Sequence, residues 1–389
     1  MRDAVIVDAV RSAVGRGKLG GALSGIHPVD LSAQVLQDLE RRTGVDPNQI
    51  DDVIWGCVSQ VGEQAADIAR YAVLAAGWPE SVPGVTVDRQ CGSSQQAVHQ
   101  ATAGVIAGQY DIVVAGGVES MSRIPMGAAF VEGKLGIPFS PLISRRYPGV
   151  AFNQGTSAEM IAEEYGFSRG ELDNHALESH ARAAAAIDEG RFAGQIAPVT
   201  ITDEDGDHTV TIDEGIRRDG TPESLGRLRT SFKENGVITA ANSSQISDGA
   251  SALLVTTSTI AEANGWTPLA RFHTGTVLGS DPIKMLTGPI PATAKALSRA
   301  GLTIGDIGAF EINEAFASVT LAWLRETGAK SELLNPNGGA IALGHPLGAS
   351  GGRLMTTLVH HMRDNNIRYG LQAMCEGGGQ ANATILELL

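Results

Sequence analysis

Short apolar runs alternate with helical apolar spacing along the first 118 residues. The apolar runs predict strands at 4–9, 53–58, 84–88 and 111–115, and helices are predicted at 28–42, 65–76 and about 92–107. Strands that alternate with helices favour a mostly parallel sheet with helices packed on its faces. We expect the paired glycines Gly116 and Gly117 to end the last of these strands, because glycine marks tight turns.

The alternation breaks in the middle of the chain. Residues 119–248 are richer in proline, glycine and charge and contain one strong helical pattern, at 169–189. A second α/β pattern then runs to the end, and it repeats the order of glycine-rich turn, helix, strand and glycine run seen in the first. We therefore predict an N-terminal half at 1–118, completed by about 249–268, an inserted domain at 119–248 and a C-terminal half at 269–389.

Composition narrows the possible functions. At 389 residues the chain exceeds the size at which one hydrophobic core stops growing, which agrees with a duplicated fold. Its formal net charge of −14 repels nucleic acid and anionic membranes, and no apolar run reaches membrane-spanning length. The first residues enter a strand pattern without signal-peptide anatomy, so we expect a cytoplasmic protein. Three cysteines are an odd number in a long chain, which argues against a disulfide framework and favours reduced thiols.

Cys91 is the first candidate for chemistry. It lies where a predicted strand gives way to a predicted helix, followed by the small residues Gly92, Ser93 and Ser94. The partial positive charge at a helix start stabilises thiolate, so we expect the pKa of Cys91 to be lowered. A buried structural cysteine is the alternative at this position, and we expect that role for Cys57.

His345 is the second candidate. It stands between Gly344 and Pro346 in the charge-poor, glycine-rich stretch 335–352, in a loop rather than on an apolar helix face. Such a histidine can take the proton of a cysteine nucleophile. The alternative is a hydrogen-bonded loop histidine without a catalytic role.

Cys375 is the third candidate. It follows a predicted strand and precedes the glycine run 377–379, whose unobstructed backbone N–H groups suit an oxyanion hole. The thiol itself can act as an acid or base. A phosphate loop is the alternative, but the run lacks the Lys-Ser/Thr ending.

Asn313 lies between two carboxylates, Glu311 and Glu314, at a predicted strand end. This grouping is open to two interpretations, a metal site or a strand end that continues into a helix cap. No histidine or cysteine ligand lies near in the sequence.

Together these segments resemble the thiolase family over essentially the whole chain. The matching segments are Asp88-Arg-Gln-Cys91-Gly-Ser-Ser, residues 239–250, Asn313-Glu-Ala-Phe-Ala317, residues 344–351 and Cys375-Glu-Gly-Gly-Gly379. The resemblance implies a five-layer αβαβα fold made of two similar halves with mixed, mostly parallel sheets. It also implies that the insertion is a loop domain that covers coenzyme A (CoA).

The resemblance also implies roles for particular residues. Cys91 would be the acylated nucleophile, His345 its base and Cys375 the group that shuttles the proton of the acetyl carbon. Asn313, through a water, and His345 would form one oxyanion hole, and the backbone N–H groups of Cys91 and Gly377 the other.

The implied reaction is CoA-dependent cleavage of a 3-ketoacyl-CoA to acetyl-CoA and a shortened acyl-CoA, or the reverse condensation. CoA would be a co-substrate, held by Arg217, Ser224 and Ser244, and no metal or permanently bound cofactor is implied. Acyl-CoA and CoA would be the small-molecule partners, and the family suggests a homodimer or homotetramer.

The chain departs from the commonest family pattern at three places. Gly-Ser-Ser follows Cys91, the acidic Glu376 follows Cys375, and Phe152-Asn153-Gln154 stands where short-chain biosynthetic members have a His-Met pair. The last difference favours a degradative thiolase of fatty acid or lipid metabolism, with a bulkier acyl group.

Two other functions compete with a thiolase. A ketoacyl synthase-type condensing enzyme would lack the second catalytic cysteine. A catalytically silent acyl-CoA or lipid carrier on the same scaffold would have lost the nucleophile or the base.

Overall fold

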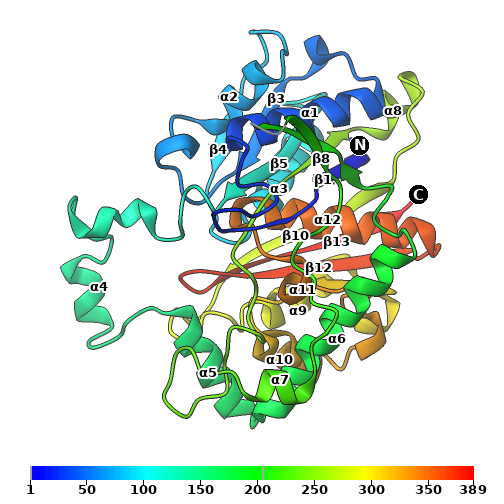
Figure 1. The fold of residues 1–389 in the computed structure, drawn as a ribbon. Coiled ribbons are helices and arrows are strands. Elements are labelled where there is room, and N and C mark those ends of the chain that lie inside the picture. The colour runs from blue at the N-terminus through cyan, green and yellow to red at the C-terminus, as the bar shows by residue number, and fades with distance from the viewer. Residues whose placement is uncertain (1, 204–205) are drawn as a thin grey trace.

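The N-terminal half is a five-stranded part of a large sheet, in the order β4, β3, β5, β9, β1. The computed structural model describes residues 2–203 and 206–389 (Figure 1). The elements of this half are β1 (Val5–Ser12), β2 (Gly15–Arg16), α1 (Pro28–Thr43), β3 (Asp52–Gly56), α2 (Ile68–Ala75), β4 (Val85–Val87), α3 (Ser93–Ala107), β5 (Ile112–Ser120), β9 (Ser247–Thr256) and α8 (Ser258–Ala263). The pairs β3–β4 and β3–β5 are parallel, whereas β9 pairs antiparallel with β5 and β1.

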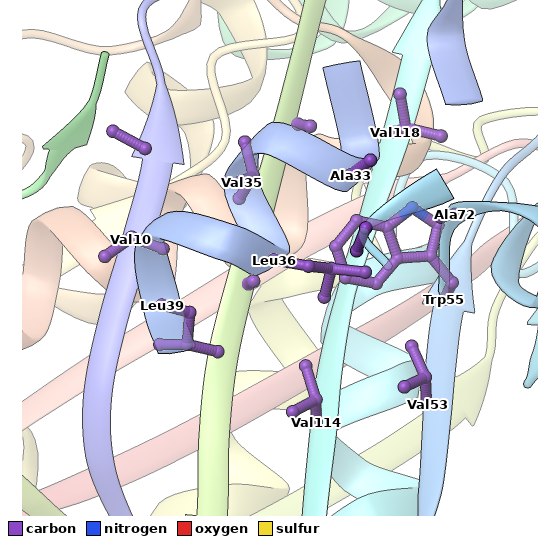
Figure 2. Packing of buried hydrophobic residues seen from close by; sticks show 14 of the residues in the cluster. Val10, Ala33, Val35, Leu36, Leu39, Val53, Trp55, Ala72, Val114 and Val118 are labelled. Carbon is purple, nitrogen blue, oxygen red and sulfur yellow. The ribbon is translucent and has the colours of Figure 1, made fainter. Parts of the chain in front are cut away.

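Helix α1 shows how the local sequence fixes an element of this half. The His27 side chain accepts a hydrogen bond from the Val29 N–H at the helix start, and Gly44, with φ 65°, ends the helix. The helix turns Leu36 and Leu39 onto the sheet, where they pack in a cluster with residues of the strands (Figure 2). The helix predicted at 28–42 is therefore confirmed.

The paired glycines do not end strand β5, and this prediction is wrong. The strand continues through Gly116 and Gly117 to Ser120. A Cβ on Gly117 would lie 2.2 Å from the Gly348 carbonyl oxygen and 2.6 Å from that of Gly56. These glycines therefore allow another part of the backbone to approach the strand closely. From the sequence alone, a glycine needed for close approach cannot be told from a glycine that ends a strand in a turn.

The C-terminal half extends the same sheet in the order β10, β13, β12, β11. Its elements are β10 (Ala270–Gly279), α9 (Pro289–Ala300), β11 (Ala309–Ile312), α10 (Ala317–Thr327), α11 (Ala340–Leu343), α12 (Leu347–Asp364), β12 (Tyr369–Glu376) and β13 (Gln380–Leu388). The β11–β12 pair is parallel, and β13 pairs antiparallel with β12 and β10. A short antiparallel pairing of β1 with β10 joins the two halves.

Helices α3 and α12 lie in the middle of the molecule, between the two halves (Figure 1). They pack on each other. Helix α3 also covers β3, β5 and β9, and α12 lies against β5 and β9 of the first half and against β11 and β12 of the second. Helices α1 and α2 pack on the outer side of the first half, and α9 packs on that of the second. Because α3 and α12 lie between them, the two parts of the sheet form separate layers, and the order is helix–sheet–helix–sheet–helix, as we predicted.

The segment between β5 and β9 packs mainly on the second half. It contains α4 (Pro141–Arg146), α5 (Gln154–Tyr165), α6 (Arg169–Asp188), β6 (Ile196–Ala197), β7 (Val199–Asp203), β8 (Gly206–Val210) and α7 (Pro222–Gly226). Helices α5 and α6 contact α10, and α6 also contacts α11. The part around α4 extends away from the body (Figure 1), and its Leu135 and Leu142 are exposed. Within the described residues, no helix combines the length and apolarity needed to cross a bilayer.

The close approach at Gly117 makes a testable prediction. Gly117→Ala should lower the free energy of unfolding by about 2 kcal/mol or more, because the new methyl group meets two backbone carbonyl groups that cannot rotate away. Gly170→Ala is the matched control: Gly170 lies in α6 with nothing within 4 Å of the added methyl group. We expect that change to be neutral or to stabilise by up to ~1 kcal/mol. Urea unfolding measures both, and equal stability of the two variants would contradict the packing described.

Candidate active site

Cys91 lies in the turn that connects β4 to α3. Gln90 has φ 49°, and Gly92 is the N-cap of α3. A Cβ on Gly92 would lie 2.0 Å from the Glu376 carboxylate and 2.5 Å from Asn382 Oδ1, so the glycine leaves room for these two side chains directly after the cysteine. Cys91 packs with Leu347, Leu354 and Met374. The turn therefore brings the cysteine against the start of α12 and the end of β12.

The Cys91 thiol is not acidic in this structure, contrary to our expectation. Burial, followed by the charge of Glu376, raises the pKa of Cys91 to about 12. Hydrogen bonds from the Gln154 side chain and from the backbone N–H groups of Cys91 and Gly377 act in the opposite direction. The expectation considered only the effect of the helix start on the pKa of Cys91. Desolvation by residues distant in sequence has the larger effect on that pKa.

His345 precedes α12 and is held by two side chains. Its Nδ1 lies 2.6 Å from Ser350 Oγ, and that hydroxyl donates its own proton to the Pro346 carbonyl oxygen. Ser350 Oγ must therefore accept from Nδ1–H, which leaves Nε2 unprotonated and able to act as an acceptor. Nε2 lies 3.4 Å from Asn313 Nδ2. Burial, with a smaller effect of Arg353, lowers the pKa of His345 to about 3, so the imidazole is a neutral base.

Asn313 and Cys375 lie at the ends of neighbouring strands. The Asn313 N–H donates to the Ala373 carbonyl oxygen at 3.1 Å, directly after β11. Asn313 Oδ1 is buried and accepts no hydrogen bond from the described residues. Burial, and next the charge of Cys91, raise the pKa of Cys375 well above its ordinary value. The two thiols are therefore close enough to influence each other.

The glycine run after Cys375 forms a hairpin turn. Gly378 and Gly379 have φ values of 82° and 77°, and strand β13 begins at Gln380. This geometry differs from a phosphate loop, in which a helix follows the glycines. The Gly377 N–H is one of the groups that lower the pKa of Cys91 against the larger effect of burial. The turn thus supplies a backbone donor beside the cysteine.

Glu314 is a structural anchor. Its carboxylate accepts hydrogen bonds from Ser179 Oγ at 2.7 Å, Asn335 Nδ2 at 3.1 Å and the Ile341 N–H at 3.2 Å. The carboxylate is thus occupied by protein donors, so the metal interpretation has no geometric support there. The strand-end interpretation is confirmed by β11, but the helix-cap part is wrong, because Phe316 is the N-cap of α10 and has no side-chain cap bond.

The three residues expected to contact CoA lie in different settings. Arg217 is exposed, and its guanidinium has no ion-pair partner in the part of the chain that the structure describes. Ser224 caps α7 together with Thr221. The Ser244 N–H donates to the Ala315 carbonyl oxygen at 2.9 Å, between the Asn313 and His345 segments. Ser244 is thus the one of the three that lies beside the catalytic candidates.

Sequence reasoning missed two side chains that act on these candidates. Ser350 holds His345, and the Gln154 side chain lowers the pKa of Cys91 against the effect of burial. The signal for Ser350 was its place within the glycine-rich stretch, five residues after His345. Gln154 was noted only as a departure from the family pattern.

A buried cysteine beside a second cysteine, a neutral histidine and convergent N–H donors defines an acyl-transfer site. Comparison with known proteins agrees. The thiolase N-terminal domain model matches residues 4–259 and the thiolase C-terminal domain model matches residues 266–388. The chain therefore belongs to the thiolase family, and the predicted enzyme class is confirmed.

Individual relatives cover the full chain. Steroid 3-ketoacyl-CoA thiolase FadA6 of Mycobacterium tuberculosis is 50% identical over 100% of this chain and 95% of its own. A 3-ketoacyl-CoA thiolase of Aeromonas salmonicida is 46% identical over 100% of both chains. The crystal structure of the Bacillus anthracis acetyl-CoA acetyltransferase is similar with a TM-score of 0.91 and 37% identity, and covers 100% of this chain and 99% of that one. The predicted fold is thus confirmed.

The high pKa of Cys91 predicts how the free enzyme reacts with iodoacetamide. Because only thiolate reacts, alkylation of Cys91 should rise about tenfold per pH unit from pH 7 to 9 without a plateau. Mass spectrometry of the cysteine peptides measures the rate at each pH, and the fully buried Cys57 serves as the internal control. A plateau below pH 7 would show an acidic thiol and contradict the site described.

Proposed function

We propose that this protein is a degradative thiolase that uses free CoA to cleave 3-ketoacyl-CoA, with Cys91 as the nucleophile. The observation that carries the proposal is the convergence of Cys91, Cys375, Asn313 and a neutral His345 from both halves of the fold. Each of these groups suits one requirement of carbon–carbon cleavage beside a thioester.

The first half-reaction breaks the carbon–carbon bond. The Cys91 proton moves to His345 Nε2 as the sulfur attacks the ketone carbon and forms a C–S bond. The bond between C2 and C3 then breaks, which leaves the acyl group on Cys91, and the electron pair goes to the enolate of acetyl-CoA. Cys375 donates a proton to that carbon, and acetyl-CoA leaves.

The second half-reaction releases the acyl group. The thiol of a new CoA gives its proton to the Cys375 thiolate, and its sulfur attacks the acyl-Cys91 carbonyl carbon. Cys91 leaves and regains its proton from His345. Both cysteines and the histidine thus return to their starting state, and no metal or permanently bound cofactor is needed.

The same geometry supports two oxyanion holes in this proposal. The backbone N–H groups of Cys91 and Gly377 suit the oxygen of the tetrahedral intermediate. A water held by the unpaired Asn313 Oδ1, with His345 Nε2, suits the oxygen of the enolate. A water there would also remove the free-energy penalty of a buried acceptor without a partner.

CoA binding is assigned to the inserted loop domain, residues 119–248, with Arg217, Ser224 and Ser244 as contacts. A chain with net charge −14 repels CoA at a distance, so a local cationic surface is required. Arg217, Arg227 and Arg229 supply it, since none of the three has an ion-pair partner within residues 2–203 and 206–389. Arg218, by contrast, pairs with Asp188 at 2.8 Å.

The acyl group is assigned to the bulky class. The relative from Mycobacterium tuberculosis is named for steroid 3-ketoacyl-CoA. In this chain Cys375 belongs to a buried apolar cluster with Met285, Leu286 and Phe316, which favours hydrocarbon beyond the reacting carbons. A cytoplasmic homodimer or homotetramer remains part of the proposal.

A substrate panel with free CoA tests the proposed function. The wild-type protein should consume 3-ketoacyl-CoA only when CoA is added, with ring-bearing or long acyl chains preferred over acetoacetyl-CoA. A ketoacyl synthase-type enzyme would instead require a decarboxylating donor, and a silent carrier would bind the panel without turnover. Either of those results would overturn the assignment.

Substitutions should separate the roles of the two cysteines. Cys375→Ser should still form an acyl-enzyme at Cys91 from a simple thioester, because that step needs no carbon acid. It should slow deuterium exchange into the methyl group of acetyl-CoA by roughly 100-fold or more, since a serine hydroxyl is a far weaker acid. Cys57→Ala is the control for loss of a buried thiol. If Cys375→Ser exchanged deuterium as fast as the wild type, Cys375 would not be the acid/base.

Arg217 and Arg218 form a matched pair for CoA binding. Arg217→Ala should raise KM for CoA several-fold with kcat nearly unchanged, because a contact far from the reacting bond stabilises the ground and transition states alike. Arg218→Ala should have little effect, since Arg218 is engaged with Asp188. The effect at Arg217 should shrink at high salt. Equal KM values for both variants would show that Arg217 faces water.

A further inference from the structure

Glu119 lies near the end of β5, and its side chain is fully buried. Oε1 accepts hydrogen bonds from the Ser59 N–H at 3.0 Å and from Gln64 Nε2 at 2.8 Å. Oε2 accepts from the Val58 N–H and the Gly348 N–H, both at 2.9 Å. Burial raises the pKa of Glu119, but a proton would displace one of these four donors, so the group is a carboxylate at neutral pH. One oxygen, Oε2, therefore joins two segments that are far apart in the sequence.

The first of these segments, residues 57–59, supports the turn that carries the nucleophile. It follows β3 directly, and its Cys57 N–H donates to the carbonyl oxygen of Val87, the last residue of β4, at 3.1 Å. Strand β4 leads into the turn that contains Cys91. A displacement of residues 57–59 would therefore move the end of β4 and the nucleophile with it.

The second segment is the first turn of α12, which orients the base. Gly348 is the second residue of this helix, so its N–H has no acceptor within the helix, and a carboxylate is favourable at a helix start. Two residues later, Ser350 Oγ lies 2.6 Å from His345 Nδ1 and donates to the Pro346 carbonyl oxygen at 2.8 Å. Glu119 therefore fixes the turn of helix that holds the imidazole.

We propose that Glu119 is a positioning residue for acyl transfer, whose carboxylate fixes the His345 imidazole relative to the Cys91 thiol. It acts through residues 57–59 on one side and through the first turn of α12 on the other. Proton transfer from a thiol to an imidazole requires the two groups to be within hydrogen-bond reach and well aligned. The proposal rests on the thiolase function, in which His345 takes the proton of Cys91.

A purely structural role for Glu119 is the alternative. Four buried N–H groups would lose their acceptor without this carboxylate, which lowers the stability of any fold. That role predicts a loss of stability without a selective effect on the step that uses His345. The two roles therefore differ in which reactions of Cys91 they affect.

Two substitutions of Glu119 test the positioning role. Glu119→Asp keeps the charge but is one methylene group too short to reach both segments, and Glu119→Met keeps the length without an acceptor oxygen. In both, acylation of Cys91 by a simple acyl-CoA should slow by roughly 10- to 100-fold, as expected for misplaced reacting groups. Alkylation of Cys91 by iodoacetamide at pH 8 should stay within about threefold of the wild type, since that reaction does not need His345. Intact-protein mass spectrometry measures both rates.

Gln64→Met is the matched control. It removes one donor from Oε1 and leaves the connection through Oε2 intact. It should lower stability, because it also removes the acceptor of the Ser120 N–H, yet acylate Cys91 within about threefold of the wild type. Urea unfolding establishes that each variant is folded under the assay conditions.

A double-mutant cycle with Ser350→Ala supplies a second measurement. If Glu119 acts through the orientation of His345, Glu119→Asp should slow acylation by about threefold or less once Ser350 no longer holds the imidazole. A structural role predicts the same factor in both backgrounds.

Each of the other results decides against the positioning role. Wild-type acylation in the Glu119 variants, a parallel fall of acylation and alkylation, or equal factors in the two backgrounds would overturn the proposal while the wild type still forms its acyl-enzyme. Loss of folding in both Glu119 variants would show a structural role and overturn it as well; if only Glu119→Met fails to fold, Glu119→Asp decides. A wild-type protein that forms no acyl-enzyme would overturn the thiolase function itself.

Discussion

The site depends on the close approach of two helices that start in different halves of the fold. At the contact between α3 and α12, the Gly352 N–H donates to Ser94 Oγ at 2.8 Å. A Cβ on Gly351 would lie 2.3 Å from the α3 backbone. Because only glycines allow this distance, the turns before the two helices converge, and these turns carry Cys91 and His345. Placing the nucleophile and its base is therefore a consequence of backbone packing.

Burial then sets the charge state of the site. Desolvation raises the pKa of both thiols and lowers that of His345, so the free site holds neutral thiols and a neutral imidazole. Negative charge appears only when substrate reacts, and the backbone N–H groups of Cys91 and Gly377 are already in place for it. Ser350 contributes by fixing the tautomer in which His345 Nε2 is unprotonated.

Much of this arrangement could be predicted from the sequence, because it depends on local signals. The caps of α1, the alternating strands and helices, and the motifs around Cys91, His345 and Cys375 are all local. The parts that failed depend on contacts between distant segments. Gly117 is a glycine within a strand because the start of α12 packs against it, and the Cys91 thiol is less acidic because it is buried by distant residues.

The central claim is that one cysteine holds the acyl group while the other handles protons. The most direct measurement is to mix the protein with a 3-ketoacyl-CoA without free CoA, quench with acid and map the acyl group by peptide mass spectrometry. The account predicts one acyl group on Cys91, an unmodified Cys375, and loss of the adduct when CoA is added before the quench. An acyl group on Cys375, or a Cys91 adduct that CoA does not remove, would contradict it.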